Sequence, residues 1–181
     1  ERSPPDPSML DMRNAIIQDK AGSIWFGSNG GGAYKFDGQA LTNLSERDGL
    51  CNNFVQAILQ DHEGNLWFGT RFGGVSEYDG KTFTAVTREE LKGDNITSLF
   101  QDSGGTIWMG ISAIGLCSCK GGSFTCYSEK DGPGIRVVMS MLEDTDGQLW
   151  FGTGAGRYRF DGGRFTSVAK ADALRGVNVA G

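Results

Sequence analysis

The sequence predicts an all-β protein built from four tandem copies of one antiparallel unit, and three observations predict it. Four tryptophans follow one another at intervals of 42, 41 and 42 residues, at Trp25, Trp67, Trp108 and Trp150. Each tryptophan lies in the same short string of residues. Glycine supplies 29 of the 181 residues without the three-residue period of collagen, so the chain must turn often.

The repeated string reads Asp-x-x-Gly-x-Ile/Leu-Trp-Phe/Met-Gly, and its copies begin at Asp19, Asp61, Asp102 and Asp144. Further along, three copies carry an aromatic residue before Asp-Gly, and all four then carry a second apolar position. The third copy departs from this pattern with Cys-Lys-Gly-Gly at 119–122. Matches at fixed offsets indicate an internal repeat of about 42 residues.

The second copy shows the expected elements in order. Its four short runs of β-prone residues are 54–60, 65–70, 74–78 and 82–87. The first turn contains Asp-x-x-Gly, in which the aspartate can accept hydrogen bonds from the following backbone and the glycine can adopt positive φ. The last turn contains Asp-Gly, a strong hairpin signal. Each copy is therefore expected to form a four-stranded antiparallel sheet.

The second strand of each copy carries consecutive apolar residues, such as Leu66, Trp67 and Phe68, so apolar side chains point to both faces of the sheet. A radial stack of four-stranded sheets covers both faces, and a repeat of this length fits that arrangement. The sequence thus predicts a β-propeller whose tryptophans form the core between blades, each with a hydrogen-bond partner for its indole N–H.

The expected blades cover approximately 11–46, 54–88, 95–129 and 136–170, within a single propeller domain or propeller segment at 1–181. An open array would expose apolar faces and unpaired strand edges. Either four blades close on themselves, or another copy completes the ring, or the chain is a piece of a longer protein. We expect a closed or nearly closed four-bladed ring, because the terminal residues add too little for a fifth blade.

The repeat string, followed by the glycine and aromatic-Asp-Gly run, closely resembles the two-component regulator propeller repeat over about 11–170. Repeats of this family occur mostly in extracytoplasmic sensor regions of bacterial hybrid histidine kinases. The resemblance implies a periplasmic or extracellular sensor module, without catalysis, that binds a carbohydrate-like ligand in two-component signalling. The alternative is a structural or protein-interaction module that assembles with another copy or with a partner.

Charge and composition argue against several other functions. The chain carries 17 basic and 22 acidic residues, a net charge of −5 that does not suit a nucleic-acid backbone. No apolar run is long enough to span a bilayer. Four cysteines and a single histidine, His62, lack zinc spacing, and a calcium loop starting at Asp144 would need a glutamate where Ala155 stands. No metal, cofactor or catalytic residue is expected, since His62 lies within a turn.

The loops that vary between copies are expected at one end of the propeller, and the repeated turns at the other. Loops held on a rigid scaffold commonly bind ligands. The candidate ligand-binding residues are Asn29, Arg71, Phe72 and Arg136. Of these, Arg71 and Phe72 form the most ligand-like pair, although a surface arginine beside a packing phenylalanine is the simpler interpretation. The same end would display the loop residues Glu46, Arg47, Arg88 and Ile111–Ile114.

The cysteines of the third copy allow one specific hypothesis. If the last hairpin has a four-residue loop at Lys120–Ser123, Cys119 faces Phe124 and Cys117 faces Cys126. A disulfide could then join Cys117 and Cys126 across the two strands. A two-residue loop would pair different residues, and free buried thiols are the alternative.

Overall fold

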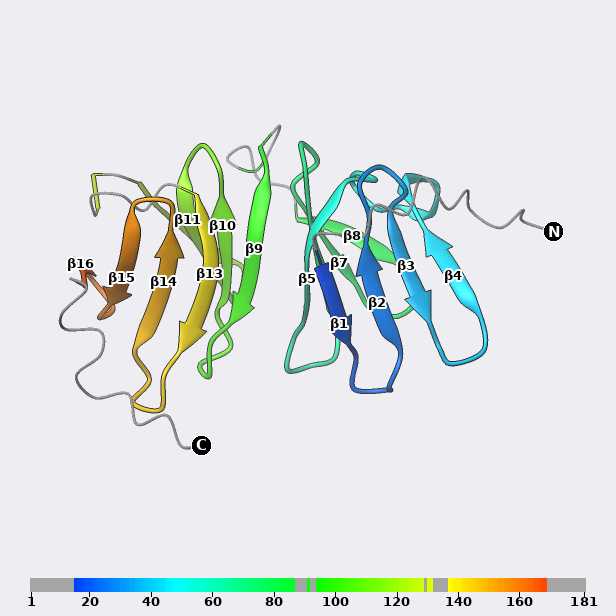
Figure 1. Ribbon diagram of the computed structural model, residues 1–181, viewed down its shortest axis with the longest axis horizontal. Coiled ribbons are helices and arrows are strands. Elements are labelled where there is room, and N and C mark those ends of the chain that lie inside the picture. The colour runs from blue at the N-terminus through cyan, green and yellow to red at the C-terminus, as the bar shows by residue number, and fades with distance from the viewer. Residues whose placement is uncertain (1–14, 87–90, 92–93, 129, 132–136, 169–181) are drawn as a thin grey trace.

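The computed structural model describes residues 15–86, 91, 94–128, 130–131 and 137–168, which form four antiparallel four-stranded sheets, here called the first to fourth blades (Figure 1). The first blade contains β1 (Ala15–Gln18), β2 (Ile24–Gly27), β3 (Ala33–Phe36) and β4 (Leu41–Leu44). The second contains β5 (Val55–Gln60), β6 (Leu66–Thr70), β7 (Val75–Tyr78) and β8 (Phe83–Val86). The third contains β9 (Ile96–Gln101), β10 (Ile107–Ile111), β11 (Gly115–Lys120) and β12 (Ser123–Tyr127). The fourth contains β13 (Val138–Glu143), β14 (Leu149–Thr153), β15 (Gly156–Phe160) and β16 (Phe165–Ser167).

The predicted fold class is confirmed. Strands follow one another along the chain in every blade, and the four strands of the second blade begin and end within one residue of the predicted runs. A short 3-10 helix, η2 (Glu46–Asp48), connects the first blade to the second. The outer parts of the predicted blade ranges, such as 11–14, 87–88 and 169–170, lie outside the described residues.

The repeated aspartate shapes the first turn of every blade. In the first blade, Asp19 Oδ1 accepts the backbone N–H groups of Ala21 and Ser23 at 3.0 and 2.8 Å. Its other oxygen, Oδ2, accepts the indole N–H of Trp25 at 2.8 Å. The same indole bond occurs in the other three blades, from Trp67 to Asp61, Trp108 to Asp102 and Trp150 to Asp144. The expected partner of each indole is therefore the aspartate that caps its own turn.

Hydrogen bonds to three turn aspartates, Asp37, Asp79 and Asp144, make the fold sensitive to acid. The indole of Trp150, followed by the backbone N–H of Gln148, holds the pKa of Asp144 below its ordinary value of 3.8. Backbone N–H groups likewise lower the pKa of Asp37 and of Asp79. A carboxyl whose folded-state pKa is depressed contributes stability above its unfolded pKa and loses it as pH falls through the folded pKa.

We therefore expect the melting temperature to fall as the pH is lowered from about 5 toward 2, the range in which depressed carboxyls take up protons. The Asp144→Asn variant should melt lower than the natural chain at neutral pH and lose less on acidification, because its amide does not titrate. Melting followed by circular dichroism across this pH range measures both effects. An equal acid-induced decrease in both proteins would contradict the assignment to Asp144.

Neighbouring blades pack through their tryptophans. Trp25 of the first blade is 2% exposed and lies among side chains of the second blade, including Phe68, whose ring centroid is 5.7 Å away. Trp67 packs in the same way on the third blade, and Trp108 on the fourth. The predicted core between blades is thus confirmed for these three tryptophans.

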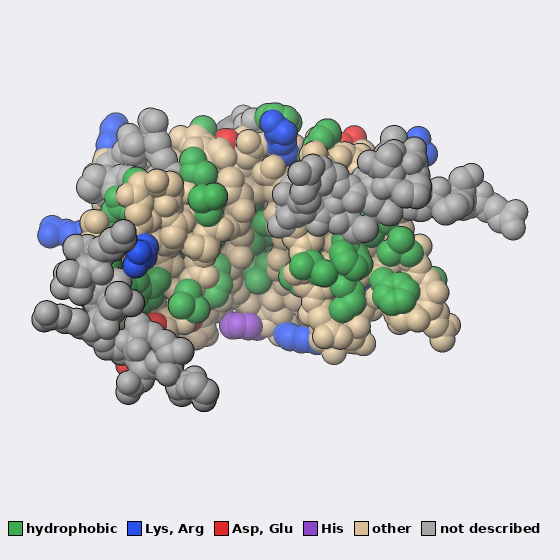
Figure 2. All heavy atoms as spheres, viewed as in Figure 1, with side chains coloured by type: hydrophobic (Ala, Val, Ile, Leu, Met, Phe, Trp, Pro, Cys, Tyr) green, Lys and Arg blue, Asp and Glu red, His purple; other side chains and the backbone are tan. Residues whose placement is uncertain are grey.

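The four blades do not close into a ring by themselves, which corrects our expectation of a closed or nearly closed arrangement. The innermost strands pack in chain order, β1 on β5, β5 on β9 and β9 on β13, whereas β13 and β1 do not pack on each other in this way. Apolar side chains remain exposed on both end blades, as the face in Figure 2 shows.

The β11–β12 hairpin has the register that places Cys117 opposite Cys126 and Cys119 opposite Phe124. It turns at Lys120–Ser123, where Gly121 and Gly122 both have positive φ. Cys117 and Cys126 are joined by a disulfide, and among the described residues Cys51 and Cys119 are free.

This pairing predicts the number of reactive thiols. Alkylation of the unfolded chain without reductant should modify two cysteines, Cys51 and Cys119, and alkylation after reduction should modify four. Intact mass spectrometry distinguishes the two states, and peptide mapping should recover Cys117 linked to Cys126. Four modified cysteines in protein secreted to an oxidising compartment would refute the bridge.

Candidate functional site

The variable loops gather at one end of the blades, opposite the repeated turns, as predicted (Figure 1). We use the name loop rim for the part of this end that joins the first three blades. The loop rim consists of Asn29, Phe54, Arg71, Phe72, Asp94 and Asn95. Phe54 and Asn95 each precede the innermost strand of their blade, so the rim follows the inner edge of the propeller.

Backbone contacts between blades hold the loop rim together. Asn29 of the first blade forms an isolated bridge with Phe54 of the second, and Arg71 of the second forms one with Asn95 of the third. The backbone N–H of Arg71 also donates to the carbonyl of Phe54 at 2.8 Å. Because each loop bonds to the next blade, the rim is a continuous backbone-linked surface rather than a set of separate loops.

Arg71 and Phe72 form the most exposed part of the rim. The guanidinium carbon of Arg71 lies 4.9 Å from the centre of the Phe72 ring, within the range of a cation–π contact. Phe72 is 55% exposed and has a φ of 72°, a left-handed conformation that costs a residue with a Cβ about 1–2 kcal/mol. Its N–H donates to the carbonyl of Asp94 at 3.0 Å, and this bond holds the strained residue in place.

Asn95 carries a buried polar atom without a partner. Its Oδ1 accepts no hydrogen bond within the described part of the chain, although the atom is shielded from solvent. An unpaired buried acceptor costs about 1–3 kcal/mol, so its persistence calls for an explanation. It lies across the bridge from Arg71, at the centre of the loop rim.

The structure brings together three of the four residues predicted to bind ligand. Asn29, Arg71 and Phe72 are exposed on the loop rim, whereas Arg136 lies outside the described residues, as does Arg88. Ile111, expected among the loop residues, is a correction: it pairs with Ile96 of β9 as the last residue of β10 and is fully buried between the second and third blades. Sequence reasoning missed Phe54 and Asn95, which share one position of the repeat, immediately before the innermost strand.

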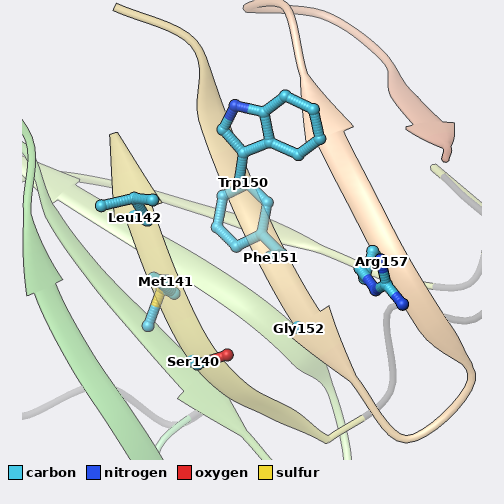
Figure 3. A pocket seen from close by; sticks show the side chains of 7 residues that line it. All are labelled: Ser140, Met141, Leu142, Trp150, Phe151, Gly152 and Arg157. Carbon is cyan, nitrogen blue, oxygen red and sulfur yellow. The ribbon is translucent and has the colours of Figure 1, made fainter. Parts of the chain in front are cut away.

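A second candidate is a depression of about 240 Å³ on the outward face of the fourth blade (Figure 3). The residues that line it are Ser140, Met141, Leu142, Trp150, Phe151, Gly152 and Arg157. Figure 3 shows Leu142 and Trp150 side by side on neighbouring strands, with Arg157 across the depression on β15. The depression is shallow and mainly apolar, and it occupies the face on which a following blade would pack.

Neither region forms a metal-binding cluster within the part of the chain that the structure describes. The described ranges bring no group of three or more His, Cys, Asp and Glu side chains together in a way that could hold a metal ion. His62 lies in a repeated turn at the opposite end, where its backbone N–H donates to Gln101 Oε1 at 2.7 Å. The loop rim presents the aromatic rings of Phe54 and Phe72, the guanidinium group of Arg71 and the amide group of Asn29.

The family model described as two component regulator propeller matches residues 8–30, 49–72, 90–112 and 131–155, together more than half of the chain. The chain belongs to the two-component regulator propeller family. Each match includes one copy of the tryptophan string, so the family assignment rests on the same residues that form the interfaces between blades.

Solved structures with this fold belong to proteins of different kinds. The extracellular domain of BT3049 from B. thetaiotaomicron, assigned as a hybrid two component system, matches with a TM-score of 0.76 and 23% identity over 89% of this chain and 23% of that one. The corresponding domain of BT4673 matches with a TM-score of 0.69 and 20% identity over 85% of this chain and 21% of that one. Virginiamycin B lyase from Staphylococcus aureus matches with a TM-score of 0.71 and 16% identity over 91% of this chain and 57% of the lyase chain.

This chain thus spans about a quarter of the two extracellular domains that it resembles. At these identities the likeness shows a shared fold. No curated protein matched the sequence. Within the described residues, no helix is both long and apolar enough to cross a membrane.

Proposed function

We propose that this propeller is a non-catalytic sensor module that works outside the cytoplasm and binds a carbohydrate-like ligand at the loop rim. Membership of the two-component regulator propeller family supports the sensor role. The extracellular domains of BT3049 and BT4673, which share the fold, support a location outside the cytoplasm.

The observation that carries the proposal is the Arg71–Phe72 pair on the loop rim. A strained, exposed phenylalanine with a guanidinium over its ring has no packing role that would justify its conformation. Exposed rings such as Phe72 and Phe54 can pack on the apolar face of a sugar. Arginine and asparagine side chains such as those of Arg71 and Asn29, both exposed, can hydrogen-bond its hydroxyl groups.

A thermal-shift screen against a panel of neutral and acidic oligosaccharides tests the proposal. A ligand that binds only the folded chain must raise its melting temperature. We expect at least one oligosaccharide to do so, and we expect Arg71→Ala and Phe72→Ala each to remove most of the shift. Lys81→Ala is a matched control, because Lys81 is exposed in a repeated turn at the opposite end of the blade.

Two results would count against the proposal. One is the lack of a shift across the whole panel. The other is a shift that Arg71→Ala and Phe72→Ala leave unchanged, since binding would then occur elsewhere, for example in the depression on the fourth blade.

A further inference from the structure

The two end blades each expose an apolar face that is buried in the other blades. On the first blade, Ile16 is 66% exposed, and on the fourth blade Leu142 is 60% exposed. Their counterparts in the second blade, Ile58 and Leu59, pack against the first and third blades respectively. Exposed apolar patches of this kind mark surfaces that another molecule covers.

Each interface between described blades follows one design, in which a tryptophan of one blade enters a socket on the next. Around Trp25, the socket of the second blade consists of Ile58, Leu66, Phe68, Tyr78 and Phe83. Around Trp108, the socket of the fourth blade consists of Met141, Leu149, Phe151, Phe160 and Phe165. These two sets occupy the same positions of the repeat.

The first blade carries the same socket without a tryptophan in it. Its residues at these positions are Ile16, Ile24, Phe26, Phe36 and Leu41, all apolar and none fully buried. The fourth blade carries the complementary part, because Trp150 projects from β14 with no aromatic partner among the described residues and is less buried than the other three tryptophans. One chain therefore has an empty socket at one end and a free tryptophan at the other.

A polar contact between neighbouring blades also repeats, at the end of the blades that carries the repeated turns. It runs in the same direction as the tryptophan contact, from each blade to the next. The backbone N–H of the residue after each turn aspartate donates to the last side chain of the next innermost strand, from Lys20 to Gln60 at 2.7 Å and from His62 to Gln101 at 2.7 Å. In the third interface Ser103 donates to Glu143 at 2.5 Å.

The first blade has an acceptor for this contact without its donor, and the fourth blade has a donor without its acceptor. Gln18 donates its amide to Gly22 O as Gln60 does to Gly64 O, so its Oε1 is oriented like that of Gln60, yet it accepts no hydrogen bond from the described residues. The equivalent donor on the fourth blade is the backbone N–H of Thr145, which has no acceptor in the described chain.

We propose that a second copy of this chain covers both end faces, with the fourth blade of each copy packed on the first blade of the other. The proposal commits to a second copy because the same chain holds both halves of the interface, apolar and polar. In two copies related by a two-fold axis, the fourth blade of each copy packs on the first blade of the other, so both end faces of both chains are covered. The result is a closed ring of eight blades, a size that propellers adopt. This inference is independent of ligand binding at the loop rim.

Sedimentation velocity and light scattering of the full chain test the proposal. The expected mass is twice 19.4 kDa, without larger species, because a closed ring has no free end. Leu142→Lys and Ile16→Glu should each give a folded monomer, since either charge disrupts both interfaces of the ring while its side chain is exposed in the single chain. Mixing the two variants should restore a dimer, because the introduced lysine of one copy then faces the introduced glutamate of the other and the remaining interface is unchanged.

The control is Phe72→Ala, a change at an exposed aromatic residue on the loop rim, which should leave the dimer intact. A monomer at every concentration would overturn the proposal and assign the end faces to other blades or to another protein. A dimer that survives both charged variants, or open-ended oligomers in place of a dimer, would overturn it as well.

Discussion

Replacing Trp108 by alanine is expected to destabilise the chain by about 3–5 kcal/mol, the cost of truncating a fully packed aromatic residue. The ring is 4% exposed and contacts Phe151 and Phe160 edge to face, with centroids 5.8 and 5.5 Å away. Removing it also takes the indole N–H from Asp102, leaving a mostly buried carboxylate oxygen without its 2.8 Å partner. Since a domain is stabilised by only about 5–15 kcal/mol, the variant should be near the limit of folding.

Urea denaturation followed by tryptophan fluorescence and circular dichroism measures this loss. Phe72→Ala is the matched aromatic truncation, because Phe72 is 55% exposed and its ring lies against Arg71, while the backbone bond to Asp94 does not depend on the side chain. Its expected effect is within about 0.5 kcal/mol, as for other surface changes. If Trp108→Ala cost no more than this control, the tryptophan would not be the main contact between the third and fourth blades.

The repeat explains why so much of the fold could be predicted from the sequence. The turn at Asp19 and the Asp-Gly hairpins form through contacts within a few residues, so their signals are local. Consecutive apolar residues around Trp67 reveal a sheet covered on both faces without any knowledge of the neighbour. Repetition of these signals at one spacing then identifies neighbouring blades as each other's partners.

Closure and the loop rim could not be predicted in the same way. Whether β13 reaches β1 depends on the angle between blades summed over three interfaces, and no single residue of the sequence determines that angle. The sequence does not single out Phe54 and Asn95, because they differ in residue type and share only a position before the innermost strand. Their proximity to Asn29 and Arg71 arises from bridges between blades, which sequence spacing does not show.

Replacing Gly110 by alanine is expected to cost roughly 1–3 kcal/mol, the range for overpacking a closely packed interior. A Cβ at this position would overlap the carbonyl oxygen of Val138, on the innermost strand of the fourth blade, and the side chain of Ser98. The carbonyl cannot move away freely, because the hydroxyl groups of Thr97 and Ser98 both donate to it at 2.6 Å. The methyl group must therefore separate the third and fourth blades or break these bonds.

Gly154→Ala is the matched control, since a Cβ there meets no atom within 4 Å and the residue has no left-handed φ. It should be neutral or slightly stabilising, because alanine restricts the unfolded chain more than glycine does. Comparing the two variants by urea denaturation separates the general effect of losing a glycine from the effect of crowding between blades. Equal stabilities would show that the third and fourth blades can separate at Gly110 at no cost. The glycine two positions after the tryptophan in each repeat would then be needed for the strand itself rather than for the approach of the next blade.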